Sequence, residues 1–266
     1  MSLVLRNIRA LLNPRRHRAE QAEASRMLRS VTEATDGVAD RIRGFLQSDA
    51  WLVRNCGIKI IARTRCVELY DVLLDKLADR SEAPIIRRNC AERIPTVEIE
   101  PERAIPALRQ ALGDPYWETR AEAARALART ADASPELEAD LLAALEGERN
   151  QETKAGLAEA LGRLAVSRAG FDRLAELANG GPWLVRHQAA VALLEMGARR
   201  PEFAREAAEV VRRLDLLAEG AATRSVFRDR MLELAALTQE GRPFPSPELL
   251  RKRYFHLQEG WLKPRA

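Results

Sequence analysis

The sequence predicts an all-α protein built as an α-solenoid, a superhelix of about six antiparallel helical hairpins. Three observations support this prediction: a basic residue returns every 32–34 residues, helical spacing surrounds each return, and no alternating apolar run bounded by turns indicates a strand. The recurring basic residues are Arg54, Arg87, Arg120, Lys154 and Arg186.

Each basic residue is followed by the same arrangement of side chains. Around Arg120, a small residue follows at the fourth position (Ala124) and a large aliphatic one at the seventh (Leu127). Such spacings lie on one face of an α-helix. Six residues before Arg120, Asp114 is a good helix-capping type, and Pro115 suits the first helical position. We therefore expect each hairpin to contain a helix A, a turn, and a helix B that carries the basic residue in its second turn.

The expected elements follow one another through short connections. A short helix over residues 3–12 is broken by Asn13-Pro14, and a polar helix over 16–34 follows. The six hairpins are expected at 38–63 (helices 38–47 and 50–63), 66–94 (helices 66–79 and 83–94), 101–131, 134–166, 169–197 and 201–238. A Pro-rich stretch over 242–247 ends the array, and a last helix covers 247–258.

This layout divides the chain into three parts. Residues 1–35 form a basic N-terminal helical segment, residues 36–238 the repeat solenoid, and residues 239–266 a Pro-rich linker with a basic C-terminal tail helix. The fold expectation therefore includes an extra N-terminal helix and a C-terminal helical tail.

Positive charge is concentrated at the two ends of the chain. Residues 1–29 hold seven Arg and two Glu, and residues 241–266 hold six Lys or Arg and two Glu. Between them, 30 basic residues face 35 acidic ones, a net charge of −5. A solenoid that binds nucleic acid along its body would carry its positive charge there, so this distribution argues against that function class.

The three cysteines, Cys56, Cys66 and Cys90, predict a reducing environment. Their odd number and the lack of a CxxC pair argue against a disulfide framework or a zinc site. We interpret them as free thiols that pack as small hydrophobic side chains. No stretch of about 18 apolar residues predicts a transmembrane helix, and the first residues make a poor secretory signal. A cytoplasmic location is expected.

Residues 102–130, ERAIPALRQALGDPYWETRAEAARALART, resemble a HEAT repeat of the kind also found in phycobilin-lyase-like proteins. The resemblance rests on Pro106 inside the first helix, Asp114, Arg120, Ala124 and Leu127. The turns DAWLVRNC and GPWLVRHQ fit the same pattern, and together the repeats cover roughly residues 36–238. HEAT repeats occur in proteins of many functions, so the resemblance predicts the fold and leaves the function open.

The resemblance also implies a structural role for the basic series. In HEAT families the aspartate and arginine at the positions of Asp114 and Arg120 form a ladder between neighbouring repeats. The implied ladder residues here are Arg54, Arg87, Asp114, Arg120, Lys154 and Arg186. We expect the ladder to be imperfect, because Ser48 and Ser81 replace the acid and Gly180 has no side chain. Some arginines would then find other acceptors or face solvent.

Three tryptophans, Trp51, Trp117 and Trp183, stand 66 residues apart. Two interpretations are open: a row of aromatic side chains that stacks on bases or grips a peptide, or packing within the turns between helices A and B. The other candidate contact residues are the basic clusters of the two ends: Arg15, Arg16, Arg18, Arg251, Lys252 and Arg253. Residues 3–18 can cap the first repeat, dock on a partner or touch an anionic membrane surface.

No catalytic residue, cofactor or metal site is predicted. His17, His187 and His256 lack metal-ligand spacing, and no GxSxG, P-loop or GxGxxG motif is present. HEAT-like DNA glycosylases use an aspartate near tryptophans, whereas Ala121 and His187 stand four residues after Trp117 and Trp183. A chromophore lyase would need a bilin site that the sequence does not locate.

The sequence thus favours a non-catalytic HEAT-repeat scaffold or adaptor that presents a curved surface to a partner protein within a larger assembly. The alternatives are a nucleic-acid-binding protein, including a DNA-glycosylase-like one, and a chromophore-lyase-like protein. If the protein binds nucleic acid, the arginine series is itself a candidate phosphate-binding stripe. Arg87-Arg88 and Arg186-His187 are the first positions to test.

Overall fold

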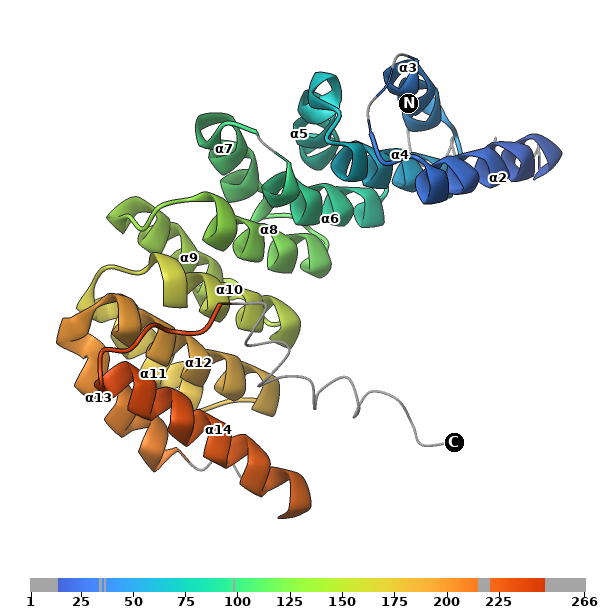
Figure 1. Cartoon of the computed structure of the whole chain (residues 1–266). Helices are drawn as coiled ribbons and strands as arrows, with labels where there is room; N and C mark the ends of the chain where they lie inside the picture. Colours follow the sequence, from blue (N-terminus) through green and yellow to red (C-terminus); the bar gives the residue numbers. More distant parts are fainter. Residues whose placement is uncertain (1–13, 34, 36, 98, 215–220, 247–266) are drawn as a thin grey trace. The chain divides into compact units, whose positions relative to one another are not determined.

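The computed structural model describes residues 14–33, 35, 37–97, 99–214 and 221–246, and all regular secondary structure in these ranges is helical (Figure 1). The chain is an all-α solenoid, which confirms the predicted fold class. The predicted helices over residues 3–12 and 247–258 lie outside the described residues.

Thirteen α-helices and two short 3₁₀ helices make up the described part of the chain. After α2 (Pro14–Ser30), five pairs of successive helices pack against each other: α3 (Val38–Gln47) with α4 (Trp51–Thr64), α5 (Tyr70–Ala78) with α6 (Pro84–Arg93), α7 (Pro101–Ala111) with α8 (Trp117–Thr130), α11 (Arg168–Asn179) with α12 (Trp183–Arg199), and α13 (Pro201–Arg213) with α14 (Ala221–Gln239). Helices α9 (Pro135–Gly147) and α10 (Gln151–Leu164) lie between α8 and α11 in the sequence. The 3₁₀ helices η1 (Val67–Leu69) and η2 (Ile94–Thr96) precede α5 and follow α6.

The basic series marks one position of the repeat. Each of its five residues is the fourth residue of its B helix, in α4, α6, α8, α10 and α12. The small and aliphatic residues that follow them are buried, as Ala124 and Leu127 are in α8. The helical face predicted from spacings of three, four and seven is therefore the face that packs into the core.

Helix α2 begins and ends earlier than the polar helix predicted over 16–34. Pro14 is its first residue, because proline has the φ angle of a helix and lacks an N–H that the first turn would leave unbonded. The helix ends at Ser30, and Gly37 then takes a positive φ of 78° as the N-cap of α3.

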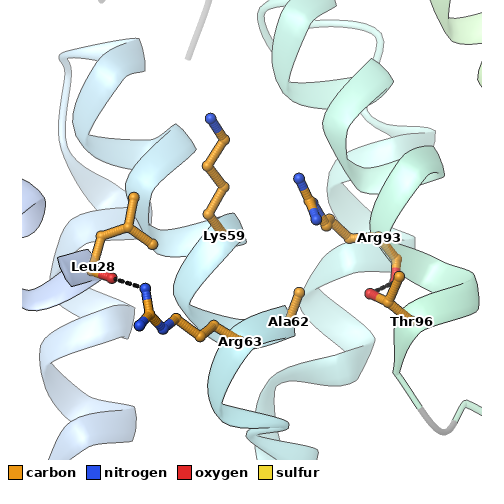
Figure 2. A pocket seen from close by; sticks show the side chains of 6 residues that line it. All are labelled: Leu28, Lys59, Ala62, Arg63, Arg93 and Thr96. Atoms are coloured by element: carbon orange, nitrogen blue, oxygen red, sulfur yellow. Dashed lines mark hydrogen bonds between the residues drawn. The ribbon is translucent and has the colours of Figure 1, made fainter. Parts of the chain in front are cut away.

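Helix α2 packs against α4 and covers the first hairpin (Figure 1). Ala24 and Met27 supply its buried face. Nη1 of Arg63 on α4 donates a 2.8 Å hydrogen bond to the carbonyl oxygen of Leu28, which ties the C-terminal end of α2 to its neighbour (Figure 2).

The chain forms two compact units. Unit 1 comprises the described residues within 1–132 and 147–157, and unit 2 those within 133–146 and 158–266. Within unit 1, helices B pack side by side, with contacts between α4 and α6 and between α6 and α8. Within unit 2, α12 contacts α11, α13 and α14. The boundaries predicted at residues 35 and 238 stay predictions.

Aromatic and polar contacts hold unit 2 together. Phe171 on α11 stacks on Phe203 on α13 with ring centroids 5.0 Å apart. Glu138 on α9 is buried, and its carboxylate accepts hydrogen bonds from the backbone N–H groups of Val166 and Gly170, both at 2.9 Å. A carboxylate at the N-terminal end of α11 also has a favourable interaction with the helix dipole. None of the described helices combines the length and apolar character needed to cross a membrane.

Candidate functional site

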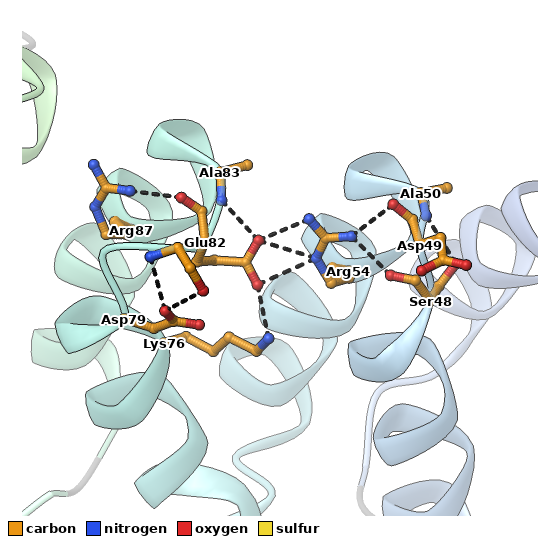
Figure 3. Close-up of polar contacts among 10 residues, drawn as sticks. Ser48, Asp49, Ala50, Arg54, Lys76, Asp79, Glu82, Ala83 and Arg87 are labelled. Carbon is orange, nitrogen blue, oxygen red and sulfur yellow. Dashed lines mark hydrogen bonds and ion pairs between the residues drawn. The ribbon is translucent and has the colours of Figure 1, made fainter. Parts of the chain in front are cut away.

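Arg54 is a buried arginine that connects two successive repeats of unit 1 (Figure 3). Its Nη2 donates to Oε1 of Glu82 at 2.7 Å, and its Nε lies 3.1 Å from the same oxygen. Its Nη1 donates to the carbonyl oxygens of Ser48 and Asp49, at 2.7 and 2.9 Å. One guanidinium therefore binds the turn of its own hairpin and the carboxylate of the next.

The next two basic residues repeat this arrangement. Arg87 donates from Nε and Nη2 to the two carboxylate oxygens of Asp114, at 2.8 and 3.0 Å, and from Nη1 to the carbonyl of Glu82 at 2.6 Å. Arg120 pairs in the same way with Glu148, at 2.7 and 2.9 Å, and its Nη1 reaches the carbonyl of Asp114 at 2.8 Å. We call these three pairs, each 27 or 28 positions apart in sequence, the arginine ladder.

The carboxylates of the ladder also hold the turns between helices A and B. Glu82 accepts a hydrogen bond from its neighbour's backbone N–H, that of Ala83, at 2.8 Å. Asp114 accepts from the N–H of Tyr116 at 2.8 Å, and Glu148 from the N–H of Asn150 at 2.7 Å. Each acid thus fixes the backbone at the start of its own B helix and binds the arginine of the preceding repeat.

Two further cations strengthen the ladder. Nζ of Lys76 lies 2.7 Å from Oε2 of Glu82, and Nη1 of Arg80 lies 2.9 Å from Oδ2 of Asp114. Burial raises the pKa of Glu82, but the hydrogen bonds from Arg54 and Lys76 outweigh this effect and lower the pKa to about 2. The Glu82 carboxylate is therefore ionised at neutral pH despite its burial.

Sequence reasoning placed the acids incompletely. The repeat spacing predicts Ser81 at the acid position, whereas Glu82, one residue later, is the partner of Arg54. The side chain of Ser81 instead donates to Asp79. Glu148, at the position six before Lys154, is the partner of Arg120. The sequence feature that marks these partners is an acid at the cap position of the turn, or one residue after it, as at Glu82, Asp114 and Glu148.

The ladder ends inside α10. Lys154 is half-buried, and its ammonium forms no ion pair with any residue in the described ranges. Gly180, at the following acid position, has no side chain to offer it. Arg186 occupies the equivalent position on α12 in unit 2.

The three tryptophans are each the first residue of a B helix: α4, α8 and α12. Trp51 is 39% exposed, and Trp117 is half-buried next to Tyr116, with ring centroids 6.2 Å apart. Trp183 is 37% exposed and stacks on His187 at a centroid distance of 5.4 Å. Because His187 is buried, its pKa falls to about 3, so the ring beneath Trp183 is neutral.

The basic clusters at the ends are only partly described. Arg15 and Arg18 are exposed on α2, whereas the side chain of Arg16 is outside the described set. The positions of the C-terminal cluster, Arg251, Lys252 and Arg253, also lie outside the described residues.

A cavity of about 540 Å³ lies in unit 1 between α2, α4 and the end of α6 (Figure 2). We call it the basic cavity, because three of its six lining residues are cations. The lining residues are Leu28, Lys59, Ala62, Arg63, Arg93 and Thr96. Sequence reasoning did not identify it, since its residues come from three separate segments and form no linear motif.

Comparison with known protein families supports the repeat architecture. Residues 70–141 match the family model of HEAT repeats, a segment that begins at α5 and ends within α9. The match includes the Arg87–Asp114 pair and Arg120 of the ladder. No curated protein sequence matches the chain. No group of three His, Cys, Asp or Glu side chains among the described residues is arranged to hold a metal ion.

Proposed function

We propose that this chain, a HEAT-repeat protein, is a non-catalytic scaffold or adaptor that presents a helical surface to a partner protein within a larger assembly. The observation that carries the proposal is the arginine ladder. Its guanidinium groups lie between carboxylates and backbone carbonyls, and Arg54 is only 1% exposed. These charges stabilise the stack, and the surface available to a partner lies elsewhere.

A stack held in this way suits recognition over an extended surface. Repeats that are fixed relative to their neighbours lose little conformational entropy when a partner binds, which favours affinity. HEAT repeats generally serve protein interaction, and the ladder gives a physical reason for such a role here. The same observation weighs against the phosphate-binding stripe, because Arg54 and Arg87 are engaged by Glu82 and Asp114.

The first surface to test includes Trp51 and Leu52 at the start of α4. Both side chains are large, apolar and more than a third exposed, at 39% and 38%. Tryptophan is enriched among the residues that contribute most to protein interfaces. The adjacent ladder residue Arg54 fixes the helix turn that carries them.

Affinity capture from the native source tests the proposal. The full-length chain is immobilised and compared with a Trp51→Ser/Leu52→Ser variant, and the bound proteins are quantified by mass spectrometry. Val67→Ser, which removes a 70% exposed apolar side chain of the same unit, serves as the control. We expect at least one protein that the wild type and the control retain and that the double variant loses.

Two results would contradict the proposal. The first is the absence of any protein enriched over a blank matrix. The second is binding that disappears after nuclease treatment, which would favour the nucleic-acid alternative, and a gel-shift assay with steep salt dependence would then support that alternative.

A further inference from the structure

We infer that the basic cavity binds an acidic segment of a partner protein, with carboxylates pairing with Lys59, Arg63 and Arg93. This inference rests on the proposed function, because it assigns the chemistry of the partner and one place where it docks.

The described residues that line the basic cavity include three cations and no carboxylate. Lys59 forms no ion pair with the described residues, and Nη1 of Arg63 donates a hydrogen bond to the carbonyl oxygen of Leu28. Arg93 lies 3.2 Å from Glu92, which is outside the lining and already pairs with Arg88 at 2.6 Å. Among the described residues, three cations therefore line one cavity and no acid does.

The positive charge of this cavity does not continue toward α8. On the neighbouring part of the helix B surface, Arg88 lies within 4 Å of three carboxylates, those of Glu92, Glu118 and Glu122, at 2.6, 3.9 and 3.8 Å. Arg125 on α8 pairs with Glu122 at 2.9 Å. Arg88 and Arg125 are thus matched by acids, and the positive surface does not continue along α8. Nucleic acid binds along an extended basic track, and no such track runs along α8.

The directions of the three cations also favour a segment over a compact anion. Figure 2 shows Lys59 and Arg93 extending from neighbouring helices toward the same space, while the guanidinium of Arg63 points to the Leu28 carbonyl. The three charged groups do not converge on one point, as they would around a single phosphate. Separate carboxylates along a peptide match this spread.

The remaining lining suits the methylene groups of acidic side chains. Leu28 and Ala62 supply apolar surface next to the cations. A cavity of about 540 Å³ exceeds the room that one inorganic ion needs and lies within the range of ordinary ligand pockets. Arg63 retains further N–H donors after its bond to Leu28, because a guanidinium has five.

The test is a fluorescence anisotropy titration of the full-length chain. The probe is a labelled dodecapeptide of eight glutamates and four leucines, and its glutamine counterpart is the control probe. We expect binding of the acidic peptide that weakens about 10-fold between 50 and 300 mM NaCl, and no binding of the glutamine peptide. We expect Lys59→Gln and Arg93→Gln each to weaken binding about 5-fold or more.

Lys154→Gln is the matched control variant. It removes a cation of the same unit that has no ion pair among the described residues and does not line the cavity. We expect it to bind the acidic peptide like the wild type. Arg63→Gln is not used, because it would also remove the hydrogen bond to Leu28. Thermal unfolding of each variant checks that the fold is retained, and if Arg93→Gln fails to fold, Lys59→Gln alone decides.

The inference is overturned if the acidic peptide does not bind, or if Lys59→Gln binds it with the same affinity as the wild type. It is also overturned if millimolar inorganic phosphate displaces the peptide. The same holds if a 12-nucleotide single strand binds more tightly than the peptide and Lys59→Gln and Arg93→Gln abolish that binding. Affinity capture with the Lys59→Gln/Arg93→Gln variant separates the two proposals. If this variant still retains the partner proteins, the cavity assignment fails and the scaffold function stands. If the wild type retains none, the scaffold proposal itself fails.

Discussion

Nη2 of Arg54 lies 2.7 Å from Oε1 of Glu82, although 28 positions separate the two residues in the sequence and both side chains are buried. An isolated charge in such a place would be strongly unfavourable, so each residue depends on the other. The pairing therefore fixes one hairpin relative to the next.

We predict that replacing arginines of the ladder destabilises the chain according to their burial. Arg54→Ala leaves Glu82 buried with one partner fewer, and we expect the free energy of unfolding to fall by about 3–5 kcal/mol. Arg120 is 21% exposed, so water can replace part of its contacts with Glu148. We therefore expect Arg120→Ala to lower the free energy of unfolding by about 1–3 kcal/mol. Urea unfolding followed by circular dichroism measures both values.

Lys154→Ala is the control for this series. Lys154 occupies the same repeat position and has no ion pair within the described part of the chain, so we expect a change below about 0.5 kcal/mol. If Arg120→Ala and Lys154→Ala lower the free energy of unfolding equally, the ion pair between Arg120 and Glu148 contributes nothing to stability.

We predict that the ladder weakens in acid through Glu82. Its pKa falls from 4.5 to about 2 in the folded chain, so the unfolded state binds a proton first as the pH falls. The stabilisation is fully present above pH 4.5, decreases between pH 4.5 and 2, and amounts to about 3 kcal/mol by linkage. Unfolding free energies measured from pH 6 to pH 2 should show this decrease.

A neutral variant isolates the contribution of Glu82 to this pH dependence. Glu82→Gln should be less stable than the wild type at pH 6 and should lose less stability on acidification, because it has no proton to bind. Parallel curves for the two proteins would assign the acid sensitivity to other carboxylates.

The repeat register could be predicted from the sequence because it depends on local spacing. A basic residue followed by small and large apolar residues at the fourth and seventh positions defines a helix face without reference to any other helix. For this reason Arg54, Arg87, Arg120, Lys154 and Arg186 all stand at the fourth residue of a B helix.

The acid partners were harder to predict because they depend on the conformation of each turn. Between α5 and α6, Asp79 accepts hydrogen bonds from the N–H and hydroxyl of Ser81, and Glu82 is the residue that reaches Arg54. The expected position thus holds a serine, and the acid that pairs with the arginine is the next residue. The basic cavity was beyond sequence reasoning for a related reason: Leu28, Lys59 and Arg93 meet only through the packing of separate helices.

We predict that Glu138 stabilises the start of α11 in unit 2. Its carboxylate accepts from the N–H groups of Val166 and Gly170 and from the hydroxyl of Ser167, at 2.9, 2.9 and 2.6 Å. Glu138→Ala should lower the free energy of unfolding by about 2–3 kcal/mol, because these partly buried donors lose their acceptor. Amide hydrogen exchange should become faster at Val166 and Gly170.

Exposed Glu146 at the other end of α9 provides the control, and we expect Glu146→Ala to change stability by less than about 0.5 kcal/mol. Unchanged exchange at Gly170 in Glu138→Ala would rule out the proposed role of this carboxylate.

We predict that Gly162 is required for the close approach of α10 and α12. A Cβ atom at this position would lie 2.7 Å from both Cα and Cβ of Ala192, and a backbone atom cannot move aside as a flexible side chain can. Gly162→Ala should therefore lower the free energy of unfolding by about 1–3 kcal/mol, although alanine is the better helix former. Gly44→Ala in α3 is the control, since a Cβ there meets nothing within 4 Å, and it should stabilise the chain by about 0.5–1 kcal/mol. If urea unfolding shows that Gly162→Ala also stabilises the chain, α10 and α12 can move apart without a decrease in the free energy of unfolding. The contact between Gly162 and Ala192 then does not constrain the packing of these helices.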